Sequence, residues 1–292
     1  RLTHVRALMQ NAGLDALVIY TNIARGAAVC WLTGFTPYWN EGLLLVPARG
    51  EMVFATALSK RVADWIESVM PAGQVITTPK PSALIGAEID ASALFADARQ
   101  QMDQAERGLL ATADHLAIRS CAAVDVESHD AKAFVAPCET VARLGGAEEC
   151  FAQVVEDLQK STAAMRADAM GALGETFAAR ISLAYKGVWT RHVVSFARDG
   201  AWQRAFDEAQ ARFLHFAFDA RQPFAAQIKD HFAGLGELVD FTVEQARGTY
   251  PLAPVANHSG TADGFSPHNP FVLHAELRLR EYRWIAARMI GL

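Results

Sequence analysis

The stretch from residue 179 to residue 196, ARISLAYKGVWTRHVVSF, constrains the fold more than any other part of the chain. Two runs rich in β-branched and aromatic residues flank Lys186–Gly187, and glycine readily supplies the positive φ that a two-residue hairpin loop requires. We therefore predict a β-hairpin in which Tyr185 pairs with Val188.

This register sorts the hairpin side chains into two faces, because successive side chains of a strand point to opposite sides of the sheet. Arg180 and Arg191 share one face, about one diagonal step apart, with Trp189 beside them. The other face is mostly apolar and is expected to pack against helices. It comprises Ile181, Leu183, Tyr185, Val188, Thr190, His192 and Val194.

The rest of the chain divides into two patterns. Helices and strands alternate through residue 80, which is typical of an α/β domain, and later segments group into blocks of helices and strands, which indicates an α+β domain. We place the boundary at residue 100, giving domains 1–100 and 101–292. Helices are expected over 2–12, 58–69, 91–141, 201–219 and 223–248, and strands over 14–20, 42–56 (a hairpin), 74–78, 150–158, 270–279 and 283–292.

Composition excludes several classes of function. The formal net charge of −5 gives no support for nucleic-acid binding. No apolar run approaches the roughly 20 residues that a membrane span needs, and no signal-peptide pattern opens the chain. The four cysteines form no CxxC pair and no zinc-type cluster, so we expect reduced thiols and a cytoplasmic protein.

Several stretches resemble the creatinase / Xaa-Pro aminopeptidase family. The N-terminal matches are RALMQNAGLDALVIY (6–20) and WLTGFTPYWNEGLLLVPARGEMVFA (31–55), and AERGLLATADHLAIRSCAAV (105–124) resembles the first long helix of the family's second domain. The hairpin resembles its first metal-binding hairpin. This resemblance implies an α/β creatinase-type N-terminal domain, an α+β pita-bread domain and a homodimer.

Family hydrolases usually hold two divalent metals with two Asp, one His and two Glu, and here the matching positions differ. The two aspartates fall at Arg180 and Arg191, and the histidine region corresponds to ARGTYPLAP (246–254), which has no histidine. Glu276 is a possible match to the first glutamate, and RWIAARMIGL (283–292) offers no acid for the second. A guanidinium cannot bind a cation in place of a carboxylate, so we expect no metal and no other cofactor.

Two arginines on one face suggest an anion-binding site, because the guanidinium fork matches a carboxylate or phosphate. With Trp189 beside them, Arg180 and Arg191 would suit a small molecule or short peptide that carries a carboxylate. The alternative is that both arginines face solvent or pair with nearby acids.

Proton transfer would fall to the segment NHSGTADGFSPHNPFVLHAE (257–276), where loop residues precede a strand from Phe271. His258 or His268 could act as a general base, and His274 and Glu276, two apart on a strand, could form a His–carboxylate pair. Turn, surface or structural roles remain the alternative.

The N-terminal segment also offers aromatic candidates. In the resembled family the corresponding loop can reach a partner's pocket, so Tyr38 and Trp39 are candidate substrate contacts, with internal packing as the alternative.

The leading hypothesis is thus a metal-independent hydrolase of a C–N bond in a small carboxylate-bearing amide or amidino compound. Its alternatives are a non-catalytic peptide- or protein-binding pseudoenzyme, and a dinuclear metallopeptidase whose ligands lie elsewhere in the chain.

Overall fold

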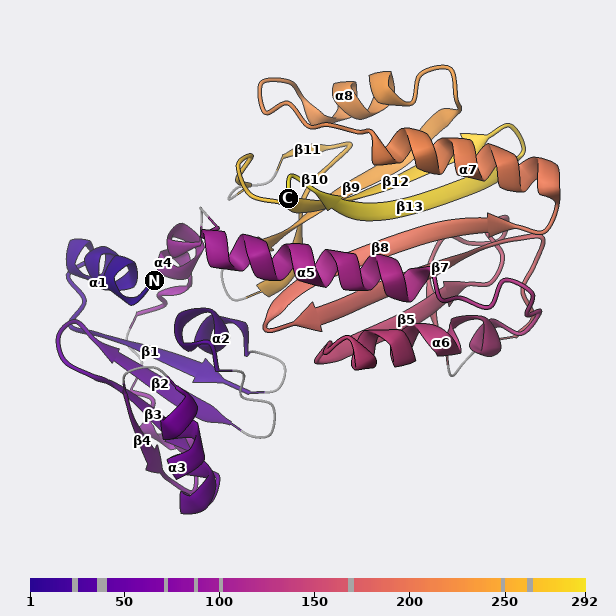
Figure 1. The fold of residues 1–292 in the computed structure, drawn as a ribbon. Helices are drawn as coiled ribbons and strands as arrows, with labels where there is room; N and C mark the ends of the chain where they lie inside the picture. The colour runs from indigo at the N-terminus through magenta and orange to yellow at the C-terminus, as the bar shows by residue number, and fades with distance from the viewer. Residues whose placement is uncertain are drawn as a thin grey trace. The chain divides into compact units, whose positions relative to one another are not determined.

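The computed structural model describes residues 1–22, 26–35, 41–70, 73–86, 89–99, 102–167, 171–247, 250–261 and 265–292. The chain divides into two compact units (Figure 1). One unit is Arg1–Gln101 with Arg247–Pro251, and the other is Met102–Ala246 with Leu252–Leu292.

The first unit contains a four-stranded sheet in the order β1-β2-β3-β4, with β4 parallel to β3 and the other pairs antiparallel. Buried Val5 and Met9 of α1 and Leu44 of β2 belong to its apolar core. Helix α2 lies in a stretch expected to be a loop. The elements are α1 Leu2–Asn11, β1 Ala16–Thr21, α2 Ala27–Thr33, β2 Gly42–Pro47, β3 Met52–Thr56, α3 Lys60–Val69, β4 Gly73–Thr77, the 3₁₀ helix η1 Pro81–Leu84 and α4 Ser92–Ala98.

The second unit contains a nine-stranded sheet in the order β11-β10-β9-β12-β13-β8-β7-β5-β6. Its helices are α5 Gln104–Cys121, α6 Ala131–Leu144, α7 Gly200–Leu214 and α8 Phe224–His231. Its strands are β5 Glu149–Val155, β6 Met165–Arg166, β7 Thr176–Tyr185, β8 Val188–Ala197, β9 Glu237–Arg247, β10 Tyr250–Asn257, β11 Gly260–Thr261, β12 Phe271–Leu279 and β13 Tyr282–Ile290.

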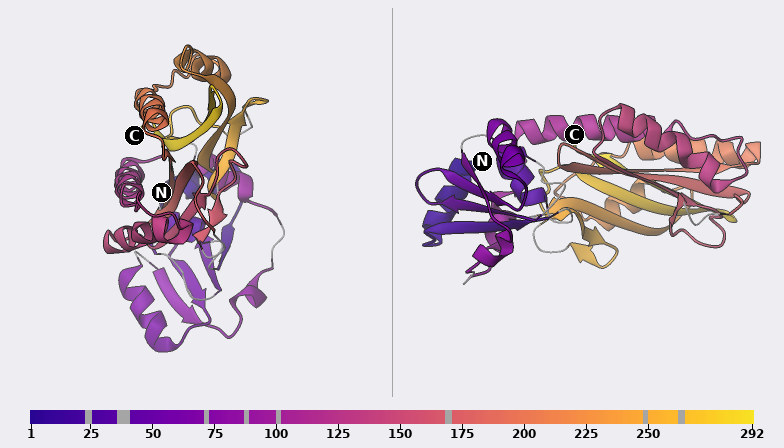
Figure 2. Two further views of the ribbon diagram at one scale, coloured as in Figure 1. Left: turned by 90° about the vertical axis from the view of Figure 1, so that its right-hand side faces the viewer. Right: turned by 90° about the horizontal axis from the view of Figure 1, so that it is seen from below.

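Helices cover one face of this sheet (Figures 1 and 2). Helix α5 contacts β7 and β8, and α7 contacts β8 and β13. The hairpin face expected to pack against helices does so: Thr190 Oγ1 donates to Asp114 Oδ1 of α5 at 3.2 Å, and His192 is buried on this side. The opposite face, which carries Arg180 and Arg191, is therefore left to form a site.

The helix expected over 223–248 is wrong in its second half. Helix α8 ends at His231, Gly234 adopts a φ of +80°, and strand β9 follows. Within β9, Phe241, Val243 and Gln245 are buried and the residues between them are not, which is the period of two expected for a strand.

The helix expected over 201–219 also ends early. Helix α7 begins at Gly200, where the Asp199 side chain accepts backbone hydrogen bonds from Ala201 and Trp202, and it ends at Leu214. The next residues connect α7 to α8 on the helix-covered side.

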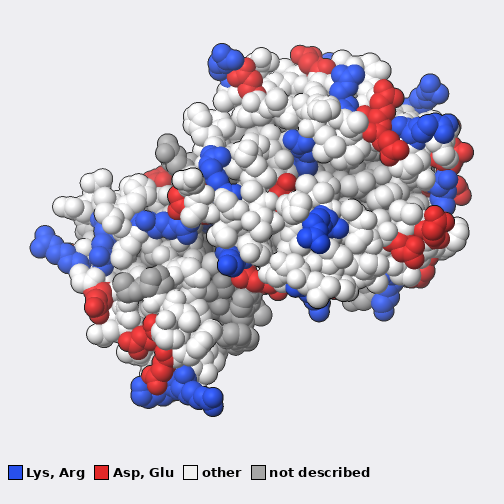
Figure 3. Space-filling view, in the orientation of Figure 1, with Lys and Arg blue, Asp and Glu red and all other residues white. Residues whose placement is uncertain are grey.

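The surface carries both signs of charge, with Lys and Arg interspersed among Asp and Glu on the face shown (Figure 3). In the described part of the chain, no helix is long and apolar enough to cross a membrane.

Candidate functional site

The hairpin register is the one expected from the sequence. Arg180 pairs with Val193 and Ser182 pairs with Arg191 across β7 and β8. Lys186 and Gly187 have φ values of 47° and 81°, as a two-residue type I′ loop requires. Both arginines therefore lie on the sheet face opposite α5, but they have different partners.

Arg191 is held by groups of the protein itself. Its Nε donates to Ser182 Oγ at 2.8 Å, and its Nη1 donates to Glu244 Oε1 of β9 at 2.6 Å and also contacts Oε2. The two side chains are only 17% and 13% exposed. The alternative that an arginine pairs with a nearby acid therefore applies to Arg191.

Arg180 lacks such a partner. Its Nε is buried without a hydrogen bond, and no carboxylate of the described residues forms an ion pair with its guanidinium. Burial, and then the charge of Arg191, lower the pKa of Arg180, while Glu244 opposes them. An unpaired buried charge is costly, so this guanidinium is suited to receiving an anion.

His274 of β12 is oriented by the same glutamate. Its Nε2 lies 2.8 Å from Glu244 Oε2. Burial alone would raise the pKa of Glu244, but the His274 hydrogen bond, the charge of the protonated His274 ring and then the Arg191 charge outweigh it and lower that pKa to about 2. An ionised carboxylate only accepts hydrogen bonds, so Nε2 carries the proton and Nδ1 keeps its lone pair. Burial lowers the pKa of His274, so the ring is neutral at pH 7.

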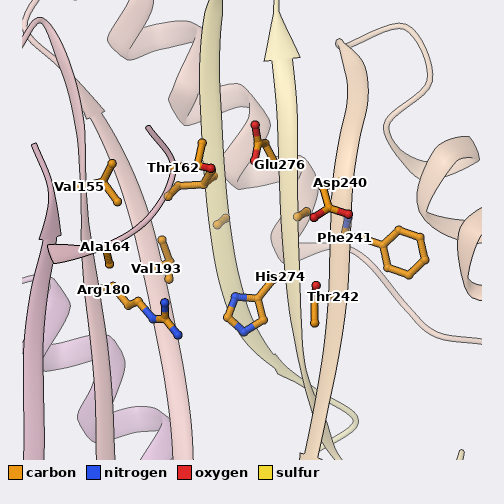
Figure 4. Close-up of a pocket in the computed structure, with 13 residues that line it drawn as sticks. Val155, Thr162, Ala164, Arg180, Val193, Asp240, Phe241, Thr242, His274 and Glu276 are labelled. Carbon is orange, nitrogen blue, oxygen red and sulfur yellow. The ribbon is translucent and has the colours of Figure 1, made fainter. Parts of the chain in front are cut away.

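A pocket of about 130 Å³ lies on this sheet face and brings these groups together. Arg180 and His274 face each other across it, with Glu276, Asp240 and Thr162 also in its wall (Figure 4). A cavity of about 150 Å³ accepts a benzene-sized molecule, so the pocket suits a ligand group of about six heavy atoms.

The acids of the wall sit in different surroundings. Glu276 pairs across the strands with Asp240, and its Oε1 lies 3.4 Å from Arg283 Nη1 without a hydrogen bond. Asp240 is exposed, and its Oδ1 accepts from the Phe241 backbone N–H at 2.8 Å. The expected pairing of His274 with Glu276 is therefore wrong, because Glu244 holds the imidazole instead.

The other two candidate histidines do not line the pocket. His258 is 42% exposed, packs its ring edge against Phe241 with centroids 4.6 Å apart, and lies 3.5 Å from Asp240. His268 is exposed, and its backbone carbonyl accepts from Arg107. Of the three candidate histidines, His274 is the one that lines this pocket.

The aromatic candidates are also resolved in part. Trp189 stacks on Phe151 of β5, with ring centroids 6.0 Å apart and planes inclined by 9°, and it does not line the pocket. Tyr38 and Trp39 lie outside the described residues. Trp189 therefore forms an aromatic pair on the same sheet face rather than a wall of the pocket.

Comparisons with known proteins agree with the fold. Residues 1–90 match the Creatinase/Prolidase N-terminal domain. The prolidase from Pyrococcus horikoshii OT3 is similar over 99% of this chain and 94% of its own, with a TM-score of 0.70 and 12% identity. Residues 1–90 thus carry a creatinase/prolidase-type N-terminal domain, and the whole chain has the prolidase fold. The resemblance and the fold class predicted from the sequence are thereby confirmed.

Two further structures are similar over nearly the whole chain. The prolidase from Pyrococcus furiosus has a TM-score of 0.64 at 12% identity, covering 100% of this chain and 99% of its own. The X-Pro aminopeptidase from Thermotoga maritima MSB8 has a TM-score of 0.63 at 12% identity, covering 97% and 94%. A comparison with curated proteins gives no significant match.

The residues of the pocket do not fit the pair of metal ions that the resemblance implies. Guanidinium groups stand at both hairpin positions, and Glu244, the hydrogen-bond partner of His274, already binds Arg191. Among the described residues, no group of three or more His, Cys, Asp or Glu is arranged to hold a metal ion. We therefore derive no chemistry through a metal at this site.

The sequence analysis missed Glu244, which organises the site. It lies in the segment interpreted as a helix, where it had no evident relation to the hairpin. Had β9 been recognised as a strand, its alternation would have placed Asp240, Thr242 and Glu244 on one sheet face, opposite buried Phe241 and Val243.

Proposed function

We propose that this protein is a metal-independent member of the prolidase fold that binds a small carboxylate-bearing amide or amidino compound and hydrolyses its C–N bond. The observation that supports the proposal is the arrangement of two groups across one small pocket. Arg180 offers a guanidinium that forms no ion pair with any described residue, and His274 offers a neutral imidazole whose orientation Glu244 fixes. Together they supply an anchor and a base.

The proposed reaction uses these groups in separate roles. Arg180 binds the carboxylate of the ligand, which places the carbon of the C–N bond between it and His274. The Nδ1 atom of His274 accepts a proton from an attacking water, a C–O bond forms, and the C–N bond then breaks as the imidazolium returns the proton to the departing nitrogen. Glu276 is one of the acids in the wall and would hydrogen-bond the departing nitrogen.

A non-catalytic binding protein is the second candidate, and one observation favours it. Glu244, the carboxylate best placed to assist a water, has both oxygens engaged by Arg191 and His274. A pocket with such a satisfied network and one free cation can select a carboxylate without performing chemistry. Ligand binding would then stabilise the protein and produce no turnover.

The deciding experiment measures binding and turnover on the same probes. N-acetylglycine and guanidinoacetate carry the two types of C–N bond on a small carboxylate, and acetate carries the carboxylate alone. We expect each of the two test compounds to raise the melting temperature, because a ligand of the native state stabilises it. Release of the amine or of urea, detected by mass spectrometry, reports hydrolysis.

Three variants assign the roles. Arg180→Gln should abolish the thermal shift, and His274→Gln should retain the shift while abolishing turnover. Arg278→Gln, which removes a half-exposed arginine from the same sheet, serves as the matched control. Binding without turnover would select the binding protein, and equal shifts in wild type and Arg180→Gln would refute both candidates.

The cytoplasmic location and the homodimer predicted from the sequence belong to the same proposal. Analytical ultracentrifugation of the purified chain tests the dimer directly, and a sedimentation coefficient of a monomer at micromolar concentration would reject it.

A further inference from the structure

The Arg191 side chain forms a link across the sheet face opposite α5. It extends from β8 to Glu244 of β9, although β13 and β12 lie between these strands in the sheet. On the other side of the same carboxylate, His274 contributes its Nε2 at 2.8 Å. The Glu244 carboxylate thus lies between a cation that the protein itself supplies and the His274 imidazole.

We propose that the Arg191 guanidinium is a fixed internal cation that binds Glu244, the hydrogen-bond partner of His274, and thereby closes a latent divalent-metal site. Glutamate oxygen and histidine nitrogen are ordinary ligands of zinc and manganese, whereas a guanidinium has no lone pair to offer. The site now holds two possible metal ligands, Glu244 and His274, and one cation, Arg191. Replacing Arg191 by an acid would therefore give three possible ligands and remove that cation. This inference does not depend on any hydrolytic activity.

The geometry supports this substitution. A glutamate at position 191 is shorter than arginine and would leave a gap to Glu244. A metal ion with a bond of about 2.0–2.2 Å to each carboxylate would fill much of that gap. The carboxylate of Glu244 is only 13% exposed, so few competing waters reach it. Without a cation, the two carboxylates, Glu244 and a glutamate at position 191, would repel each other strongly.

Arg180 must be removed for a clean test, because its charge acts on His274 and Glu244 and could neutralise a new acid. Its influence on the site appears in the pKa of His274, which the charges of Arg191 and Arg180 both lower after the effect of burial. The test variant is therefore Arg180→Gln combined with Arg191→Glu, and Arg180→Gln alone is its baseline.

A matched control reverses a charge elsewhere in the same sheet. Arg278 of β12 lies opposite Glu237 of β9, 3.5 Å from its carboxylate, but both are well exposed. Arg180→Gln with Arg278→Glu therefore brings two acids together without a buried imidazole. Calorimetric titration and thermal shift with zinc chloride and manganese chloride are measured for all four proteins, wild type included.

We expect the Arg191→Glu combination to bind zinc at least 100-fold more tightly than wild type, Arg180→Gln or the Arg278→Glu control. Saturating zinc should raise its melting temperature by about 5 °C or more, since ligand at 100 times Kd gives several degrees in proteins of this size. Adding His274→Gln should remove at least ten-fold of the affinity, which locates the ion at this site.

The proposal is overturned if the Arg191→Glu combination binds zinc no more tightly than the control does. It is also overturned if wild type binds zinc tightly through Glu244 and His274. If the combination does not fold, Arg191→Gln replaces it, because this change frees Glu244 and His274 without adding an acid. A ten-fold gain in zinc affinity over wild type is then expected, and no gain refutes the inference.

Discussion

Replacing Glu244 by glutamine tests whether the Arg191–Glu244–His274 network stabilises the fold. The substitution keeps the size and one acceptor oxygen but removes the charge that Arg191 contacts. Two guanidinium groups, those of Arg180 and Arg191, would then share a partly buried face without a carboxylate between them. Breaking a buried ion pair on one side costs about 3–5 kcal/mol, because the remaining charge is uncompensated.

The pKa of Glu244 gives an independent magnitude. Its ordinary value is 4.5 and its value in the protein is about 2. At about 1.36 kcal/mol per pKa unit, this difference corresponds to about 3 kcal/mol of stability at pH 7. The pKa is lowered on folding, so the contribution is complete well above pH 4.5 and is lost as the pH falls towards 2. At pH 4 it should already be smaller by about 1 kcal/mol.

Urea unfolding at pH 7 and pH 4, followed by the fluorescence of buried Trp284 in the same sheet, measures both quantities. The control is Glu237→Gln on the same strand, whose carboxylate is 68% exposed and should cost less than about 1 kcal/mol. The reasoning fails if Glu244→Gln is as stable as the control at pH 7. It also fails if the loss at pH 4 equals the loss at pH 7.

Three further outcomes are expected. Arg180→Gln should raise the free energy of unfolding by about 1 kcal/mol in urea while abolishing carboxylate binding, because it removes a buried charge that lacks a partner; a loss of stability would contradict this. Lys186→Asn should stabilise by about 0.5–1 kcal/mol in thermal unfolding, since asparagine tolerates the φ of 47° better than lysine does. Burial raises the pKa of Asp114, so its ionisation weakens the fold as pH rises, and Asp114→Asn should gain stability over wild type between pH 4 and pH 7 when unfolding is measured at both.

The hairpin could be predicted from the sequence because its information is local. A Lys–Gly loop between two alternating runs determines which residues pair, and the pairing then fixes the faces. The same reasoning placed His192 correctly on the buried side. Local sequence also located the hairpin of β2 and β3, which spans the expected residues 42–56.

The partners of the two arginines could not be predicted in this way. Arg191 and Glu244 are 53 residues apart, and their contact depends on the order of strands in the sheet, which no local pattern encodes. The interpretation of the β9 segment as a helix made the Arg191–Glu244 contact harder to predict. A helix has no alternating faces that could be matched to the two faces of the hairpin. The histidines illustrate the same limit, since only the placement of β12 beside β9 separates His274 from His258 and His268.

The two hairpin arginines show why residue type alone does not assign a role. Arg191 meets a carboxylate that is deep in the site, so its charge is balanced within the protein and contributes to stability. Arg180 lies on the same face, two strand positions away from the residue that faces Arg191, and meets a pocket instead. Glu276 is near Arg283, and Asp240 is exposed, so neither balances Arg180. The Arg180 side of the pocket therefore keeps a net positive charge, which disfavours a divalent cation there and favours a carboxylate.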